Sequence, residues 1–97
     1  MKVVFIFYYA EYDEDIMAIL EKTNVKSYSK LEQILGKGKT SNPRLNTAVW
    51  PGFNNALIVG VKDEEKKEML LQALRKYSDK HQGKGICVLV LPLEEII

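Results

Sequence analysis

Residues 36–54 carry three cations, Lys37, Lys39 and Arg44, and no acidic residue. The same stretch, GKGKTSNPRLNTAVWPGFN, holds three glycines and two prolines, which is typical of turns rather than of a helix or strand. Two interpretations of this charge remain open. The stretch is either a solvated polar loop, or a loop that binds a small anion or faces an acidic partner.

Trp50 lies in this stretch, directly before Pro51 and Gly52. A tryptophan whose ring enters a partner's pocket often dominates an interface, and in that case Trp50, Lys37 and Arg44 would form a partner-binding loop. The alternative is that the ring packs the base of the loop onto its own sheet or a neighbouring subunit.

No combination of side chains predicts catalysis. The chain has one histidine, His81, and one cysteine, Cys87, so it offers neither a Ser/His/Asp set nor a Cys/His zinc site. We expect His81 to be solvated at the end of a helix, and Cys87 to be a small buried apolar residue. The acids at Glu11 and 13–15 are explained by the start of a helix, and we expect no metal site there. We therefore expect a protein that is not an enzyme.

Composition narrows the class of protein further. The 97 residues (11.1 kDa) are 46% hydrophobic and 28% charged, which indicates one globular domain, residues 1–97. A net charge of +1 gives no reason to expect nucleic acid as a partner. A single cysteine and the lack of an 18-residue apolar run predict a cytoplasmic protein without membrane insertion. A chain of this size buries roughly 65% of its surface, and such thin cores are often completed by oligomerisation.

Strands are predicted at 2–10, 25–35, 55–62 and 86–91, and the long loop lies between the second and third of them. The first and last strands are the most apolar, so we expect them to be the central pair of a sheet. Because the first strand is apolar on both faces, we also expect another subunit to cover the face without helices.

Helices are predicted at 11–24 and 63–80. In the first, acids occupy the first turn and Asn24 is the stop. In the second, Asp63 is the N-cap, and the segment 82–85 ends the helix. Its predicted buried stripe is Met69, Leu70, Ala73, Leu74 and Tyr77. The order β-α-β-β-α-β predicts an α+β, ferredoxin-like fold: a four-stranded antiparallel sheet with two helices on one face.

Three stretches resemble the PII signalling superfamily in order and position. Residues 35–40 (LGKGKT) resemble the family's Gly-x-Gly-Arg-Gln start of a long loop between the second and third strands. Residues 83–85 (GKG) resemble its Gly-Asp-Gly, and 91–97 (LPLEEII) its Ser-Pro-Val-Glu-Glu-Val-Ile ending. The whole of 36–54 resembles a divergent PII-like branch. The resemblance implies a ferredoxin-like homotrimer that binds a nucleotide between subunits.

In that family, backbone amides of glycine loops and Lys or Arg side chains hold the nucleotide's phosphates. Carried over to this sequence, the ligand-binding residues are Gly36, Gly38, Lys39, Thr40, Gly83, Lys84 and Gly85. The chain departs from the family at Ile86, where lysine is usual, and at Lys39 and Thr40, where arginine and glutamine are usual. It also stops before the family's C-terminal arginines. These differences argue against ATP binding in the family's usual manner and leave an adenine nucleotide as one candidate effector.

The first hypothesis is a non-catalytic PII-like regulator. It would bind a small anionic effector between subunits and signal through the 36–54 loop to a protein such as a transporter or enzyme. One alternative resembles the CutA divalent-cation tolerance proteins, which are metal-binding trimers of the same fold. The other is a structural trimer in which the loop is a rigid arm.

Overall fold

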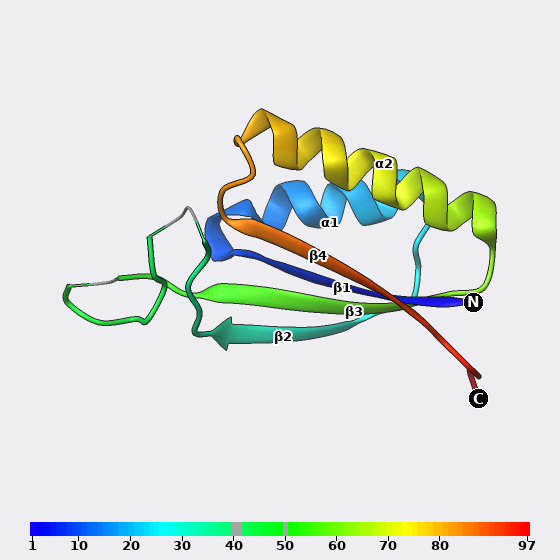
Figure 1. Cartoon of the computed structure of the whole chain (residues 1–97), viewed down its shortest axis with the longest axis horizontal. Coiled ribbons are helices and arrows are strands. Elements are labelled where there is room, and N and C mark those ends of the chain that lie inside the picture. The colour runs from blue at the N-terminus through cyan, green and yellow to red at the C-terminus, as the bar shows by residue number, and fades with distance from the viewer. Residues whose placement is uncertain (40–41, 50) are drawn as a thin grey trace.

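The first predicted strand forms β1, Lys2–Tyr9, and the chain then continues through five more main elements (Figure 1). The computed structural model describes residues 1–39, 42–49 and 51–97. After β1 the elements are a short 3-10 turn η1 (Ala10–Tyr12), α1 (Asp13–Lys22), β2 (Ser29–Ile34), β3 (Asn54–Val61), α2 (Glu64–Lys80) and β4 (Ile86–Pro92).

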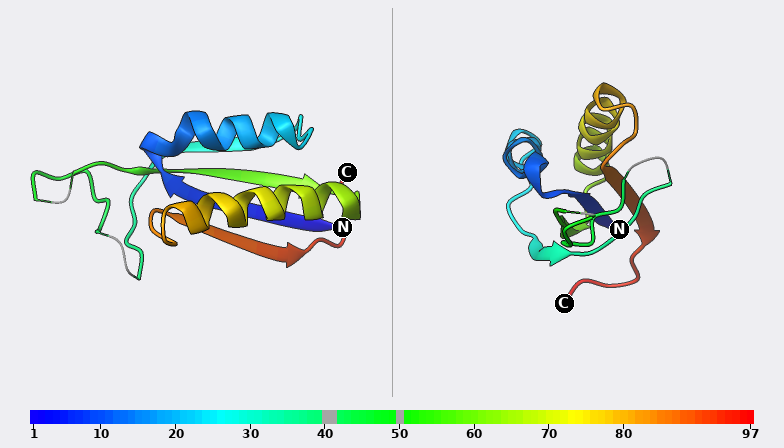
Figure 2. Two further views of the ribbon diagram at one scale, coloured as in Figure 1. Left: turned by 90° about the horizontal axis from the view of Figure 1, so that it is seen from above. Right: turned by 90° about the vertical axis from the view of Figure 1, so that its left-hand side faces the viewer.

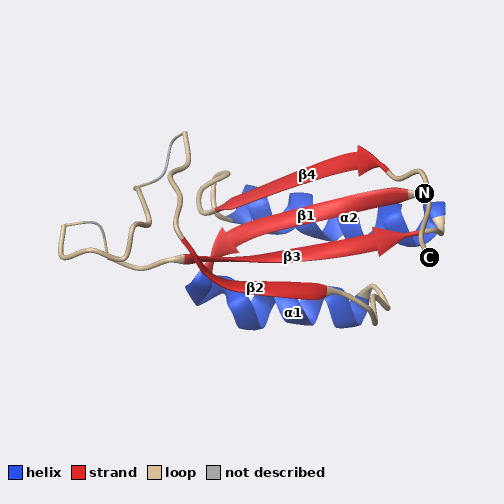
Figure 3. Ribbon diagram, turned by 90° about the horizontal axis from the view of Figure 1, so that it is seen from below, coloured by secondary structure: helices blue, strands red, loops and turns tan. Residues whose placement is uncertain are grey.

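The four strands form one antiparallel sheet in the order β2-β3-β1-β4, and both helices cover the same face of it (Figures 2 and 3). This confirms the predicted ferredoxin-like α+β fold. The predicted central pair was wrong, because β3 rather than β4 lies beside β1 in the centre. The apolar run in β4 does not mark a central strand; it supplies exposed apolar side chains, Leu89 and Leu91, at the edge of the sheet.

The core lies between the sheet and the two helices. Alternate residues of β1, Val4, Ile6 and Tyr8, are fully buried there, as the period of two in a strand requires. They pack in one cluster with residues of β3, α1 and α2: Leu57, Val59, Ile16, Leu20, Leu70 and Leu74.

Helix α2 begins and ends at defined caps. The Asp63 carboxylate accepts hydrogen bonds from the backbone N–H groups of Glu65 (2.9 Å) and Lys66 (3.4 Å), as predicted for an N-cap. The predicted buried stripe is confirmed at Leu70, Leu74 and Tyr77 but is wrong at Met69, which is 53% exposed. Leu71, which the predicted stripe did not include, is buried instead.

Strand β2 is shorter and less regular than predicted. Residues 25–28 lie outside it, and its pairing with β3 shifts register between Leu31 and Ile34. Gln33 lies inside this bulge with φ of 59°, a left-handed conformation that bends the strand just before the long loop.

The helix-free face of the sheet is apolar. Phe5 and Phe7 point to this face, and their rings are stacked at 6.3 Å. Leu31 of β2 is half exposed on the same face. The C-terminal segment folds back over one end of it, where Ile96 lies against Gly60 (Figure 2). No helix in the described part of the chain is long and apolar enough to cross a membrane.

Candidate functional site

A cavity of about 580 Å³ lies at the end of the sheet from which the long loop extends. Both glycine segments that the sequence singled out line it, Gly36 and Gly38 from the loop and Gly83 and Gly85 from the turn after α2. The structure therefore brings together two segments that are more than 40 residues apart in the chain.

Strand pairing explains why these segments meet. Ile34 at the end of β2 pairs with Asn54 at the start of β3, and Tyr8 of β1 pairs with Ile86 at the start of β4. The N–H of Tyr9 then donates to the carbonyl of Gly85 at 2.8 Å. Since neighbouring strands are antiparallel, the end of β2 and the start of β4 must lie at the same end of the sheet.

Gly85 has a steric reason to be glycine. Its φ is +75°, and a Cβ atom there would lie 2.9 Å from the ring of Tyr12. No other residue fits without moving that ring. The glycine at this turn is therefore required by the packing of Tyr12 against the backbone, and Gly85 also lines the cavity.

The described cations of the site do not all lie at the cavity. Lys37, Lys39 and Arg44 line it, whereas Lys84 is exposed and lies outside the lining. No carboxylate is found among the described lining residues, so the cavity favours anions. The predicted residues Thr40 and Trp50 lie outside the described residues.

The long loop is divided into two lobes by backbone hydrogen bonds (Figure 1). Gly36 and Arg44 pair with each other through both of their backbone N–H and C=O groups, at 2.6 and 2.8 Å. The N–H of Asn46 donates to the carbonyl of Gly52 at 2.9 Å and closes the second lobe. The first lobe therefore starts and ends at the cavity.

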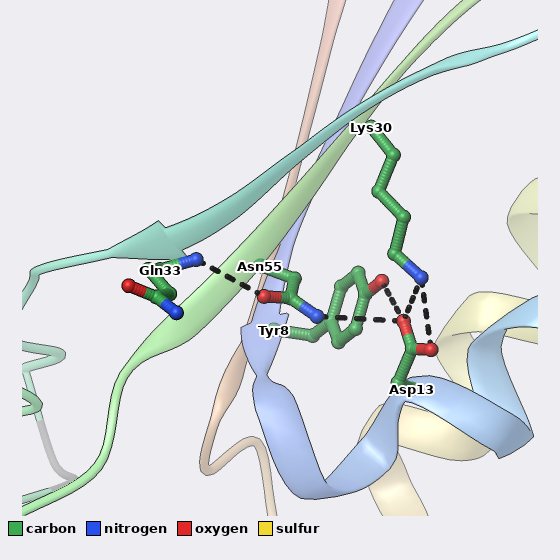
Figure 4. A network of polar contacts seen from close by, with 5 residues as sticks. All are labelled: Tyr8, Asp13, Lys30, Gln33 and Asn55. Carbon is green, nitrogen blue, oxygen red and sulfur yellow. Dashed lines mark hydrogen bonds and ion pairs between the residues drawn. The ribbon is translucent and has the colours of Figure 1, made fainter.

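The sequence did not predict a network of polar contacts that joins Tyr8, Asp13, Lys30, Asn55 and Gln33 (Figure 4). The Asp13 carboxylate accepts hydrogen bonds from the Tyr8 hydroxyl (2.5 Å) and from Lys30 (2.7 and 2.8 Å). The buried Asn55 amide donates to Asp13 at 3.5 Å, and its oxygen accepts from the backbone N–H of Gln33 at 3.3 Å. Asn55 thereby links the β2 bulge to the start of α1.

The network sets the charge state of its members. Burial pushes the pKa of Asp13 upward, but the hydrogen bonds from Lys30, Tyr8 and Asn55 and the charge of Lys30 outweigh this and lower it. Burial, followed by the hydrogen bond to Asp13, raises the pKa of the Tyr8 hydroxyl. Asp13 is thus an ionised carboxylate beside a neutral phenol.

Two predictions for single residues were wrong. His81 is not a solvated terminal residue, because its ring lies 4.5 Å from the rings of both Tyr12 and Tyr77. Cys87 is not buried; it is exposed at the cavity on the helix-free face. Both errors arise because sequence periodicity does not show which face of an edge strand, or which side of a helix end, is covered.

Comparisons with known proteins support the fold. No protein-family model matches the chain, and a search of curated proteins finds no relative. Among solved structures, the chain is similar to CPII, a nitrogen regulatory PII-like protein from Thiomonas intermedia K12, bound to ADP, AMP and bicarbonate. The TM-score is 0.76 at 21% identity, over 93% of this chain and 82% of that one.

Two further structures agree. The apo form of CPII superposes with a TM-score of 0.67 at 19% identity, over 93% of this chain and 85% of that one. A protein from Thermus thermophilus described as PII-like matches with a TM-score of 0.57 at 18% identity, over 93% and 83% of the two chains. The fold of this chain is therefore the PII-like fold, as its sequence resemblance implied.

Proposed function

We propose that the protein is a non-catalytic PII-like regulator that binds a small anionic effector at the cavity and signals through the 36–54 loop. An adenine nucleotide is the effector class we propose, because the CPII structure with the PII-like fold contains ADP and AMP. The proposal places the protein in the cytoplasm, as a homotrimer with a protein partner such as a transporter or enzyme.

The observation that carries this proposal is the meeting of the two glycine segments in one cationic cavity. Backbone amides at glycines and a nearby ammonium group are the elements of a phosphate site, and Lys39 supplies the ammonium group here. The lining of the same cavity also includes the apolar residues Phe7, Ile34 and Ile86, which offer a surface for a base or ribose.

The trimer is proposed from the helix-free face of the sheet. Apolar side chains from all four strands gather there, and large exposed apolar surfaces mark interfaces in soluble proteins. Phe7, Cys87 and Leu89 of this face also line the cavity, so a subunit that packs on the face would complete it. The predicted ligand residue Lys84 has a role in this proposal only if the turn after α2 moves toward the bound effector. Thr40 stays a proposed ligand residue.

The signalling step is proposed for the two-lobed loop. Its first lobe begins at Gly36 in the cavity, so a ligand that contacts this backbone selects one arrangement of the lobe. Lys37 and Trp50 are the proposed contacts for the partner protein. The metal-binding alternative has no observation in its favour, because no group of three His, Cys, Asp or Glu side chains in the described residues is placed to hold an ion.

Isothermal titration calorimetry with ADP, AMP and ATP, with and without bicarbonate, tests the proposal. We expect ADP or AMP to bind, and Lys39→Ala to weaken that binding by about tenfold, as for the loss of one charge-assisted hydrogen bond. Lys76→Ala is the matched control, because Lys76 is an exposed lysine on α2 away from the cavity. Failure of all nucleotides to bind, or an equal loss in both variants, would reject the proposed site.

A further inference from the structure

We propose that Arg44 is an anion-binding residue of the cavity, held ready by Tyr9, and that it couples the bound anion to the first lobe of the loop. This inference rests on the proposed function, and it adds a residue and a mechanism to the site. From the sequence, Arg44 was one of three cations in a loop that binds a small anion or faces an acidic partner, and it was named individually only as a partner contact.

The backbone of Arg44 is fixed at the cavity. Its N–H donates to the carbonyl of Gly36 at 2.6 Å, and its carbonyl accepts from the N–H of Gly36 at 2.8 Å. Gly36 and Arg44 both line the cavity, together with Lys39 and Gly85. Movement of Arg44 therefore moves the first glycine of the site as well.

The side chain of Arg44 is positioned by an aromatic face. Its guanidinium carbon lies 4.1 Å from the centroid of the Tyr9 ring, which is a cation–π contact. The Arg44 Cδ also lies close to where a side chain at Gly52 would begin, at 3.5 Å. Tyr9 occupies the last position of β1, so a rigid strand sets the position of the guanidinium.

The hydrogen-bonding capacity of Arg44 is incompletely used. Its Nη1 donates to the carbonyl of Asn42 at 3.1 Å, but its Nε is buried and has no hydrogen-bond partner in the part of the chain that the structure describes. Among the described residues, no carboxylate lies within ion-pair distance of it. A buried guanidinium N–H without an acceptor is unfavourable, so an anion in the cavity gains a ready donor.

Arginine also suits the chemistry better than the lysines nearby. A guanidinium offers several N–H donors in one plane and binds phosphate or carboxylate through two parallel hydrogen bonds, while a lysine acts as a point charge. The ligand class is therefore a small oxyanion or the phosphate groups of a nucleotide. An anion held between Arg44 and the Gly85 turn would fix both ends of the lobe that runs from Gly36 to Arg44.

Calorimetric titrations with ADP and with inorganic pyrophosphate test this inference. We expect Arg44→Gln to weaken binding of both probes by about tenfold or more, and Arg44→Lys to lose part of the affinity although it keeps the charge. Arg75→Gln is the matched control, since Arg75 is the only other arginine and is exposed on α2, away from the cavity. Tyr9→Phe should retain wild-type affinity, whereas Tyr9→Leu should lose it through the lost ring.

The outcomes separate the two proposals. If the wild type binds ADP but Arg44→Gln and Arg44→Lys bind it within about twofold of the wild type, the role of Arg44 is wrong and the proposed function stands. If the wild type binds pyrophosphate in an Arg44-dependent manner but no nucleotide, the nucleotide proposal is wrong and the role of Arg44 stands. Binding of neither probe overturns both. If Arg44→Gln does not fold, the comparison of Tyr9→Phe with Tyr9→Leu decides.

Discussion

Asp13 is held by side chains that reach it from three strands, Tyr8 from β1, Lys30 from β2 and Asn55 from β3. The sequence predicted only that an acid here would suit the first turn of a helix. That reasoning was incomplete because the hydrogen-bond partners of Asp13 are up to 42 residues away in the chain. No local sequence pattern shows which of the lysines or asparagines will contact this carboxylate. The network matters for the site because Asn55 also holds the β2 bulge from which the loop departs.

We predict that Asp13→Ala lowers the free energy of unfolding by about 2 kcal/mol, because it leaves the Tyr8 hydroxyl and Lys30 without their acceptor. In the wild type the pKa of Asp13 is lower in the folded than in the unfolded state. The stability that ionised Asp13 contributes is therefore fully present above the pKa that its carboxyl has in the unfolded state. This stability is lost as the pH falls through the lower pKa of the folded state. Urea unfolding between about pH 7 and pH 2.5 should show a drop below about pH 4 that is smaller in Asp13→Asn.

The control for this prediction is Glu14→Gln. Glu14 is an exposed neighbour on the same helix and forms no ion pair with any described residue. If Glu14→Gln flattens the pH dependence as much as Asp13→Asn does, general charge rather than the network is responsible.

At the scale of elements, the two helix ends share one design. After α2, the N–H of Gln82 donates to the carbonyl of Asp79, and the N–H of Gly83 donates to the carbonyl of Ser78. After α1, the N–H of Asn24 donates to the carbonyl of Glu21, and the N–H of Val25 donates to the carbonyl of Leu20. Both are Schellman motifs, and both place a residue other than glycine in the left-handed region, with φ of 58° at Gln82 and 61° at Asn24.

We predict that Gln82→Gly raises the free energy of unfolding by about 1 kcal/mol, since glycine adopts positive φ without the steric penalty of a side chain. Asn24→Gly should gain less, because asparagine tolerates this conformation better than glutamine. Urea unfolding at one fixed protein concentration measures both. A loss of stability in Gln82→Gly, or a larger gain in Asn24→Gly, would contradict this explanation.

The elements also show where prediction from sequence succeeds. Helix α2 was predicted almost to the residue, because its cap and its periodicity are local features. The position of β4 at the edge of the sheet was not predicted. An apolar strand has the same sequence pattern whether its own chain or another subunit covers its side chains. The resemblance singled out the two glycine segments, and their role as a ligand site stays a prediction. The stacking of Arg44 on Tyr9 and the Asn55 bridge could not be predicted, because they depend on tertiary contacts between distant residues.

At the scale of the whole molecule, the sheet has one face buried under helices and a second face over one end of which the C-terminal segment folds. Leu91 lies on the second face, opposite Val3, and is 46% exposed; Met69 is 53% exposed on α2. In a monomer these two side chains of similar size are equivalent, and a charge at either position would remain in water. In a trimer assembled through the helix-free face, only Leu91 is buried further.

We therefore predict that Leu91→Glu dissociates the assembly while Met69→Glu does not, because a carboxylate placed in an apolar interface must lose its hydration without gaining a partner. Size-exclusion chromatography with light scattering should give a mass near three times 11.1 kDa for the wild type and Met69→Glu, and near 11.1 kDa for Leu91→Glu. A wild-type mass of 11.1 kDa would reject the trimer, and a trimeric Leu91→Glu would place the interface elsewhere. Because the cavity lies beside this face, Leu91→Glu should also lose affinity for ADP if a neighbouring subunit completes the site.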